Sequence, residues 1–300
     1  ISAAWTAGGG EVWAQQGTYV EHLELSAWVD VYGGFAGTET TRVARDPASH
    51  LTVVDGGGMP PVVNCGLSGY RVSGIDGFKI TGGGTYTGGT FIPPPSSPAG
   101  WGGGVKCTLS SPVIRGNTIT RNSLGDPNTA PFDPGQGAGV ALVGSHAVLS
   151  SNTISDNEVL NRSSVGGGVY LEWSVADLWY NTIATNRAPE GSGIYAITSR
   201  PMLFNNWIGQ NENYYLPPAY FGSRTGAVNL ILCWDLDVLF NYFVSNVGST
   251  GGAIYLDQPY RGTVANNLFL NNYAWDRQLQ TGSEGGAIWL LIASAPPEPV

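Results

Sequence analysis

Two short motifs recur along the chain, and together they limit it to a narrow range of folds. The first is a glycine-rich run that ends in Val or Ile, as in Gly166-Gly-Gly-Val169. The second is Asn-x-apolar-x-x-Asn, as in Asn152/Ile154/Asn157. In the first four repeats the last glycine of the run lies 13 residues before the first asparagine. A unit repeated at constant internal spacing predicts a solenoid rather than a globular domain.

The repeats differ in length at one place only, between the second asparagine and the next glycine run. Fourteen residues separate Asn122 from Gly137, whereas four separate Asn186 from Gly191. A constant core with one variable segment predicts a coil that carries its loops at a single corner.

We therefore predict an all-β fold, a right-handed parallel β-helix (solenoid) of about nine coils with an asparagine ladder. The residues three before and two after each first asparagine are apolar and would face the core. An asparagine amide at a buried bend can bond to the coils above and below, and glycine at the next corner permits a positive φ. The first asparagines, which would form the ladder, are Asn117, Asn152, Asn181, Asn206, Asn241 and Asn267.

We expect residues 1–300 to form a single β-helix domain. Residues 1–84 would form irregular early coils, residues 85–101 a loop excursion rich in Gly, Pro and Ser, and residues 102–300 the regular repeats. The chain starts without a signal peptide and stops midway round a coil. Since an unclosed coil exposes strand edges, we expect a segment of a longer chain or one that stacks on a partner.

The composition indicates which classes of partner and which cellular location are plausible for this protein. The net charge is −9 and only 12% of the residues are charged, which disfavours nucleic acid as a partner because its binding depends on Lys and Arg. No apolar run is long enough to span a bilayer. The low charge and the 44 glycines favour an extracellular protein. Cys65, Cys107 and Cys233 form no metal-binding motif, so we expect small buried residues and leave their disulfide state open.

Some of the repeats resemble those of known families. Gly251-Gly-Ala-Ile254, following Phe243-x-x-Asn246, resembles the repeat of the chlamydial polymorphic outer-membrane proteins. The segments 31–40 and 77–81 are similar to bacterial surface proteins described as right-handed parallel β-helix repeat proteins, in the pectin-lyase-like superfamily. The resemblance implies the fold and a bacterial extracellular or cell-surface location. It leaves activity open, because that superfamily includes polysaccharide lyases, glycosidases, phage tailspikes and adhesins.

The residues that such enzymes use for catalysis do not cluster in this sequence. β-Helix glycosidases use grouped aspartates with a Gly-His-Gly element, and this chain has no Gly-His-Gly and no Asp-Asp pair. The three histidines, His22, His50 and His146, occur in unrelated contexts, where we expect surface or loop positions. We therefore expect no catalytic residues, no metal and no cofactor.

Two weaker candidates for chemistry remain. Asp235 and Asp237 are spaced by two on a predicted strand, with Asp177 in the same column, and a cation could sit between them. Solvated carboxylates on a polar strand explain the same pattern. Arg115 lies on an outward position of its strand and is the one candidate for a lyase base.

An aromatic column is the stronger functional signal. In the strand after each glycine run, several outward positions hold aromatic or acidic residues: Tyr170, Tyr195, Tyr255, Trp289, Glu172 and Asp257. Flat rings beside carboxylates suit stacking on sugars and hydrogen bonds to hydroxyls. Three interpretations stay open: a glycan groove, a contact between molecules, or a surface that the loops cover. The flanking loops contain Tyr214 and Tyr220, and a second outward patch consists of Trp179, Phe204 and Leu239.

The sequence favours a non-catalytic function. We expect an extracellular or cell-surface structural or adhesive module whose partner is a second copy of itself or a surface polysaccharide. One alternative is a polysaccharide lyase or glycosidase that uses the aromatic strand face with Glu172, Asp257 or Arg115. Another alternative is a carbohydrate-binding module without turnover.

Overall fold

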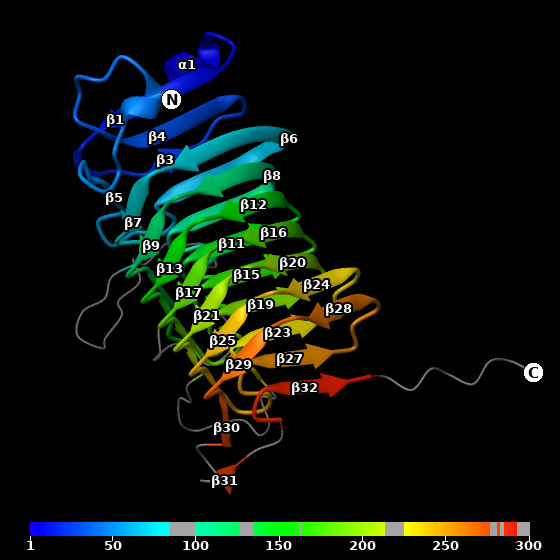
Figure 1. Ribbon diagram of the computed structural model, residues 1–300. Helices are drawn as coiled ribbons and strands as arrows, with labels where there is room; N and C mark the ends of the chain where they lie inside the picture. Colours follow the sequence, from blue (N-terminus) through cyan, green and yellow to red (C-terminus); the bar gives the residue numbers. More distant parts are fainter. Residues whose placement is uncertain are drawn as a thin grey trace, which may run out of the picture.

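The computed structural model describes residues 1–84, 100–125, 135–161, 164–213, 225–276, 281–282 and 285–292. Strands of successive coils lie side by side and stack from the N-terminal to the C-terminal part of the chain (Figure 1). Every described strand pair is parallel except β30 with β31. The predicted all-β parallel β-helix is confirmed. Residues 85–99 of the predicted excursion at 85–101 and the loop residues Tyr214 and Tyr220 lie outside the described residues.

Three sheets form the walls of the solenoid. A nine-stranded sheet has one strand in each coil up to β29, so the described residues agree with the expectation of about nine coils. Its strands are β2 (Gly17–Val20), β5 (Thr52–Asp55), β7 (Phe78–Thr81), β9 (Thr118–Thr120), β13 (Thr153–Ser155), β17 (Thr182–Ala184), β21 (Trp207–Gly209), β25 (Tyr242–Val244) and β29 (Leu268–Leu270). A seven-stranded sheet contains β10 (Ser123–Leu124), β14 (Glu158–Val159), β18 (Arg187–Ala188), β22 (Glu212–Asn213), β26 (Val247–Gly248), β30 (Tyr273–Asp276) and β31 (Thr281–Gly282).

The third sheet has sixteen strands because most coils cross it twice. Its early strands are β1 (Gly10–Gln15), β3 (Leu23–Glu24), β4 (Val29–Phe35), β6 (Val63–Asp76) and β8 (Val105–Arg115). The strands after each glycine corner are β11 (Val140–Val143), β15 (Val169–Glu172), β19 (Ile194–Ile197), β23 (Val228–Ile231), β27 (Ile254–Asp257) and β32 (Ile288–Leu291). The second crossings are β12 (His146–Ser150), β16 (Val175–Trp179), β20 (Arg200–Phe204), β24 (Leu236–Leu239) and β28 (Gly262–Ala265). A short helix α1 (Ser2–Thr6) and a 3-10 turn η1 (Arg42–Ala44) precede the regular coils.

The core is a column of apolar side chains inside the coils. Period-2 alternation along each strand places one residue in two inside. The positions three before and two after the first asparagine are fully buried from Asn117 to Asn241, as in Leu149 and Ile154, and are partly buried around Asn267. Phe243 stacks on Phe269 with ring centroids 4.9 Å apart. All three cysteines are buried, as expected, and all three are free thiols.

The asparagine corners are joined from coil to coil by side-chain hydrogen bonds. The Oδ1 of Asn152 accepts the backbone N–H of Asn117 at 3.0 Å, and its Nδ2 donates to the carbonyl of Ile114 at 2.8 Å. The same pattern continues to Asn267. A second ladder runs through the second asparagines, Asn122, Asn157, Asn186, Asn211, Asn246 and Asn272.

A third ladder, of serines, joins the corner between the two halves of the sixteen-stranded sheet. The backbone N–H of Ser145 donates to Ser174 Oγ at 3.1 Å, and that of Ser174 donates to Ser199 Oγ at 3.1 Å. Cys233 occupies the corner of the next coil, where its thiol contacts the Ala196 carbonyl at 3.6 Å. Sequence reasoning missed this ladder. Its signal is a serine seven residues before the first asparagine in four successive coils.

We predict that Asn181→Ala lowers the free energy of unfolding by about 3 kcal/mol. Asn181 is buried, accepts the N–H of Asn152 and donates to the Leu149 carbonyl, so alanine leaves both of these backbone groups unpaired inside the protein. Urea unfolding followed by tryptophan fluorescence measures the loss. The control Ser150→Ala, on the outer face of β12, should change the value by less than about 0.5 kcal/mol. Equal effects of the two substitutions would contradict a structural role for the ladder.

Candidate functional site

The predicted aromatic and acidic residues do line up on one face of the solenoid. We call this face, outside the strands β15, β19, β23, β27 and β32, the tyrosine face. Tyr170 and Tyr195 are register neighbours, Asn229 lies between Tyr195 and Tyr255, and Tyr255 is the neighbour of Trp289. Parallel pairing therefore brings together residues up to 119 positions apart in the chain (289 − 170).

The rings on the tyrosine face are less accessible than a glycan groove requires. Tyr170 is 3% exposed and Tyr255 is 4% exposed, while Tyr195 and Trp289 are half-buried. Tyr170 stacks on Tyr195 with centroids 5.9 Å apart, and Tyr255 stacks on Trp289 at 4.8 Å. Of the three interpretations left open by the sequence, the burial of Tyr170 and Tyr255 favours a covered surface for these two rings.

The glycine corners explain part of this burial. A Cβ added to Gly166, where φ is +70°, would lie 3.1 Å from the Cβ of Tyr170. A Cβ on Gly191, where φ is +55°, would lie 2.8 Å from that of Tyr195. Each turn therefore approaches the aromatic column so closely that only glycine fits without displacement, and its backbone covers the base of the ring.

Three carboxyl groups lie among these rings. The Oη of Tyr170 donates to Glu172 Oε2 at 3.0 Å. Burial raises the pKa of the Tyr195 phenol, and the carboxylates of Glu190 and Asp257 raise it further. Burial also raises the pKa of the Glu190 carboxyl. Glu190 was missed in the sequence because it precedes its glycine run, in the segment of variable length.

Two buried polar atoms on this face have no hydrogen-bond partner among the residues that the structure describes. Asn229 is fully buried, and its Oδ1 accepts the Gly226 N–H at 2.7 Å, yet its Nδ2 has no acceptor. The Oδ1 of Asp257, on the neighbouring strand, has no donor. A hydroxyl group could satisfy both kinds of atom, because it donates and accepts.

The second sequence candidate, the aspartate column, lies apart from the tyrosine face. Asp235 lies at a turn with φ +45° and pairs with Arg261, with Oδ1 and Nη1 3.7 Å apart. Asp177 and Asp237 flank Met202 in register, and Arg200, Asp235 and Asp237 line a surface hollow of about 450 Å³. Among the residues that the structure describes, no group of three His, Cys, Asp or Glu side chains could hold a metal ion.

Arg115, the candidate lyase base, is held in an ion pair. Its Nε donates to Asp76 Oδ2 at 2.7 Å, while Arg45 binds the other oxygen of the same carboxylate at 2.7 Å. Arg45 also donates to the Gly33 carbonyl at 3.0 Å. Arg115 therefore helps to fasten the segment that contains Arg45 against the coils, and the interpretation as a base is corrected to a structural one.

The histidines lie apart from one another and from the tyrosine face. His22 contacts the Pro61 carbonyl through Nδ1 at 2.6 Å, and His50 contacts Gln16 Oε1 at 3.0 Å. His146 is exposed at the start of β12. No described helix is long and apolar enough to cross a membrane.

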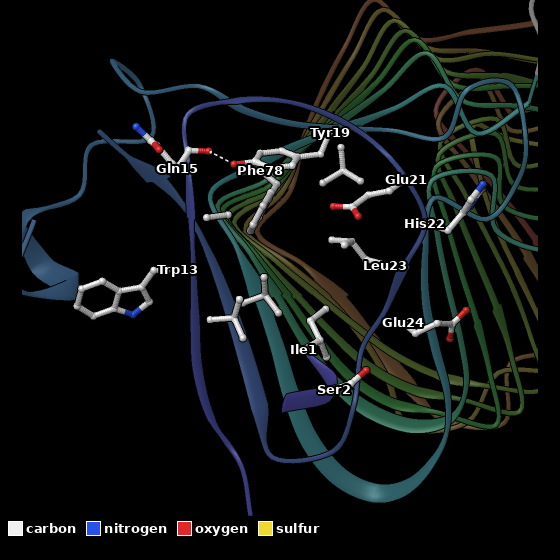
Figure 2. A pocket seen from close by; sticks show the side chains of 14 residues that line it. Ile1, Ser2, Trp13, Gln15, Tyr19, Glu21, His22, Leu23, Glu24 and Phe78 are labelled. Carbon is white, nitrogen blue, oxygen red and sulfur yellow. Dashed lines mark hydrogen bonds between the residues drawn. The ribbon is translucent and has the colours of Figure 1, made fainter. Parts of the chain in front are cut away.

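A cavity of about 680 Å³ opens at the N-terminal end of the coils. Its wall is the first layer of the apolar core, including Val31, Val54 and Phe78, and the view in Figure 2 looks along the stacked coils behind it. Tyr19 and Glu21 lie at its edge, where the Tyr19 hydroxyl donates to the Gln15 carbonyl at 2.9 Å. The cavity contains none of the aromatic or acidic site residues predicted from the sequence, so we assign it to the core.

Exposed rings gather at a different place, the first asparagine corner. Here the second outward patch predicted from the sequence, Trp179, Phe204 and Leu239, is joined by residues from the turn and from the nine-stranded sheet. We call the following six residues the aromatic corner: Trp179, Tyr180, Phe204, Trp207, Phe240 and Tyr242. Of these, Tyr180 is 60% exposed and Phe240 is 45% exposed.

Comparisons with known proteins add no relative: no family model, no curated protein and no solved structure matches the chain. The parallel β-helix is therefore established by strand topology alone.

We predict that Glu190→Gln raises the free energy of unfolding at neutral pH. Burial holds the pKa of this carboxyl above its ordinary value of 4.5, so the unfolded chain ionises first as the pH rises. The group consequently destabilises the folded chain at pH 7 and has no such effect when it is protonated in both states. Urea unfolding at pH 7 and at about pH 3 should show a gain only at pH 7.

Glu39→Gln is the control with the opposite sign. The Glu39 carboxylate accepts the backbone N–H of Ala36 at 2.7 Å and that of Gly37 at 2.9 Å, which lowers its pKa. Its replacement should lower stability at pH 7 and have a smaller effect at low pH. A loss of stability at pH 7 for Glu190→Gln would show that its carboxylate is favourably bound, contrary to our prediction.

Proposed function

We propose that this chain is a structural and adhesive module of the extracellular space or the bacterial cell surface. The observation that carries the proposal is the exposure of large aromatic side chains on a rigid solenoid. The exposed rings of Trp179, Tyr180, Phe240 and Tyr242 lie together at the aromatic corner. Apolar surface gathered in this way is typical of a protein that binds a partner.

The ladders support this function because they make the scaffold stiff. Each coil from Asn117 to Asn267 is bonded to the next at both asparagine corners. Side chains on such a scaffold keep their positions without a partner, so less entropy is lost when a partner binds. A rod that displays fixed groups suits adhesion or assembly.

The partner that we propose is a surface polysaccharide. The net charge of −9 and the small number of charged residues disfavour polyanions, whereas aromatic rings offer stacking surface to sugars. A second copy of the chain is the other partner consistent with exposed rings. The asparagine ladders and the repeat motifs also support our proposal that the chain belongs to the pectin-lyase-like superfamily of β-helix proteins.

We expect the purified full chain to bind at least one bacterial surface polysaccharide or to form ordered assemblies. Co-sedimentation with polysaccharide preparations measures binding, and negative-stain electron microscopy distinguishes single rods from filaments. A control solenoid of similar charge that lacks exposed rings should remain unbound. Single rods that bind no polysaccharide would contradict the adhesive function.

Glycoside hydrolysis is a second candidate, favoured by the carboxyl groups on the tyrosine face. Glycosidases use two carboxyl groups, and this face offers Glu190, whose pKa is raised by burial, and Asp257, both near the half-buried Tyr195. A lyase for uronate polymers fits less well, because these carboxylates would repel the substrate. None of the five strands of this face carries a cation, and Lys106, in the same column on β8, lies 5.8 Å from the centroid of the Trp101 ring.

Release of reducing ends from neutral glycans tests this second candidate. If the tyrosine face hydrolyses glycans, Glu190→Gln and Asp257→Asn should each reduce the rate by at least about a hundredfold. The control is Trp173→Ser, in the turn that follows β15 at the serine corner, and it should leave the rate unchanged. If the wild-type chain releases no reducing ends from any of the neutral glycans tested, glycoside hydrolysis of those glycans is excluded.

A further inference from the structure

The aromatic corner occupies three adjacent columns of the solenoid. One column is the last residue of the second crossings, which includes Trp179 and Phe204. The next is the turn residue just before each ladder asparagine, which includes Tyr180 and Phe240. The third begins the strands of the nine-stranded sheet and includes Trp207.

We propose that the aromatic corner is a binding site for an uncharged polysaccharide chain that lies along the solenoid axis. In this site the sugar rings stack on Tyr180 and Phe240. The proposal rests on the adhesive function proposed above and adds to it the site and the class of ligand.

The first argument is geometry. Tyr180 and Phe240 occupy equivalent turn positions with φ of 58° and 57°, and this backbone conformation directs each ring away from the core. They lie two coils apart, a separation of about 10 Å along the axis. Two exposed rings at that separation along a straight axis match an extended chain of sugar rings better than a compact ligand.

The second argument is that the exposed rings are held in place. Phe204 lies between them and makes an edge-to-face contact with each, at centroid distances of 6.2 Å to Tyr180 and 5.6 Å to Phe240. The interplanar angles are 85° and 71°. Rings fixed before binding lose little freedom when a ligand stacks on them.

The third argument is charge. From β12 to β28 the three columns contain no charged residue: Ser150, Trp179, Phe204, Leu239 and Ala265; Ser151, Tyr180, Asn205, Phe240 and Asn266; Thr153, Thr182, Trp207, Tyr242 and Leu268. The acids closest to them along the strands, Asp177 and Asp237, lie two residues before Trp179 and Leu239. An uncharged surface bordered by carboxylates is complementary to sugar hydroxyls and repels uronates, phosphates and sulfates.

The fourth argument is the alternation of rings with polar groups. Asn205 lies between Tyr180 and Phe240 in the turn column and is partly exposed, and Thr182 is partly exposed beside them. A sugar has an apolar ring face and a hydroxylated edge, so it can use both kinds of group at once. A protein partner would have to leave these amide and hydroxyl groups paired as it buried the rings.

The test uses the double substitution Tyr180→Ser with Phe240→Ser in the full chain. Serine already occupies the equivalent turn position at Ser151, with φ of 55°, so the backbone tolerates it. The control is Trp173→Ser, which removes an exposed ring from a turn with φ of 51° at the serine corner. Circular dichroism and urea unfolding establish that each variant is folded.

The probes are insoluble cellulose, β-1,3-glucan and mannan, with polygalacturonate as the charged polymer. We expect wild type and Trp173→Ser to bind at least one uncharged polymer equally. The double variant should bind it at least about tenfold more weakly, the combined loss expected from two stacked rings.

Three results would overturn the proposal. In the first, the double variant binds as tightly as wild type, which places adhesion elsewhere on the rod and leaves the adhesive function intact. In the second, only polygalacturonate binds, which contradicts the charge argument. In the third, sedimentation shows wild type to be a dimer that the double substitution dissociates, which makes the corner an interface between copies. Failure of wild type both to bind and to assemble would instead count against the adhesive function itself.

Discussion

The hydrogen bond from a buried asparagine amide to the neighbouring coil is the interaction on which this structure depends. A chain that bends sharply inside a stack of coils leaves its backbone N–H and C=O groups without strand partners, and burying them unpaired is costly. The amide of Asn152 accepts from the coil before it through Oδ1 and donates to that coil's carbonyl through Nδ2. Because one side chain performs both tasks at the same place in each coil, it fixes the bend and the register of the strands on either side.

The ladder also explains why so much of the fold can be predicted from the sequence. Few side chains can donate and accept at a buried bend, so the asparagines recur at a spacing that is easily recognised. The apolar residues at fixed offsets from them, such as Leu149 and Ile154, then identify the core. The shift between Asn266 and Asn267 is the one ambiguity in this pattern, and the ladder uses Asn267.

The candidate sites were less predictable, for physical reasons. Serine is common on β surfaces, so the serines that form the ladder through Ser174 are a weak signal in the sequence. The column of Tyr170 and Tyr255 lies outside the core, as strand alternation indicates, but the burial of its rings depends on how closely the preceding glycine turn approaches, which alternation does not reveal. The rings at Tyr180 and Phe240 were overlooked because a turn residue belongs to neither face of a strand.

The turn residue before each ladder asparagine has one further consequence, which concerns how such a rod can change over time. A left-handed backbone at a residue other than glycine costs about 1 kcal/mol, and the ladder bonds on the next residue offset that cost whichever side chain is present. Successive coils accordingly carry Gly116, Ser151, Tyr180, Asn205 and Phe240 at the same place. The ladder asparagine is the residue that folding requires, whereas the turn residue before it determines which side chain is exposed on the surface. A lineage of such proteins could therefore exchange one surface for another, coil by coil, while the backbone that presents it stays the same.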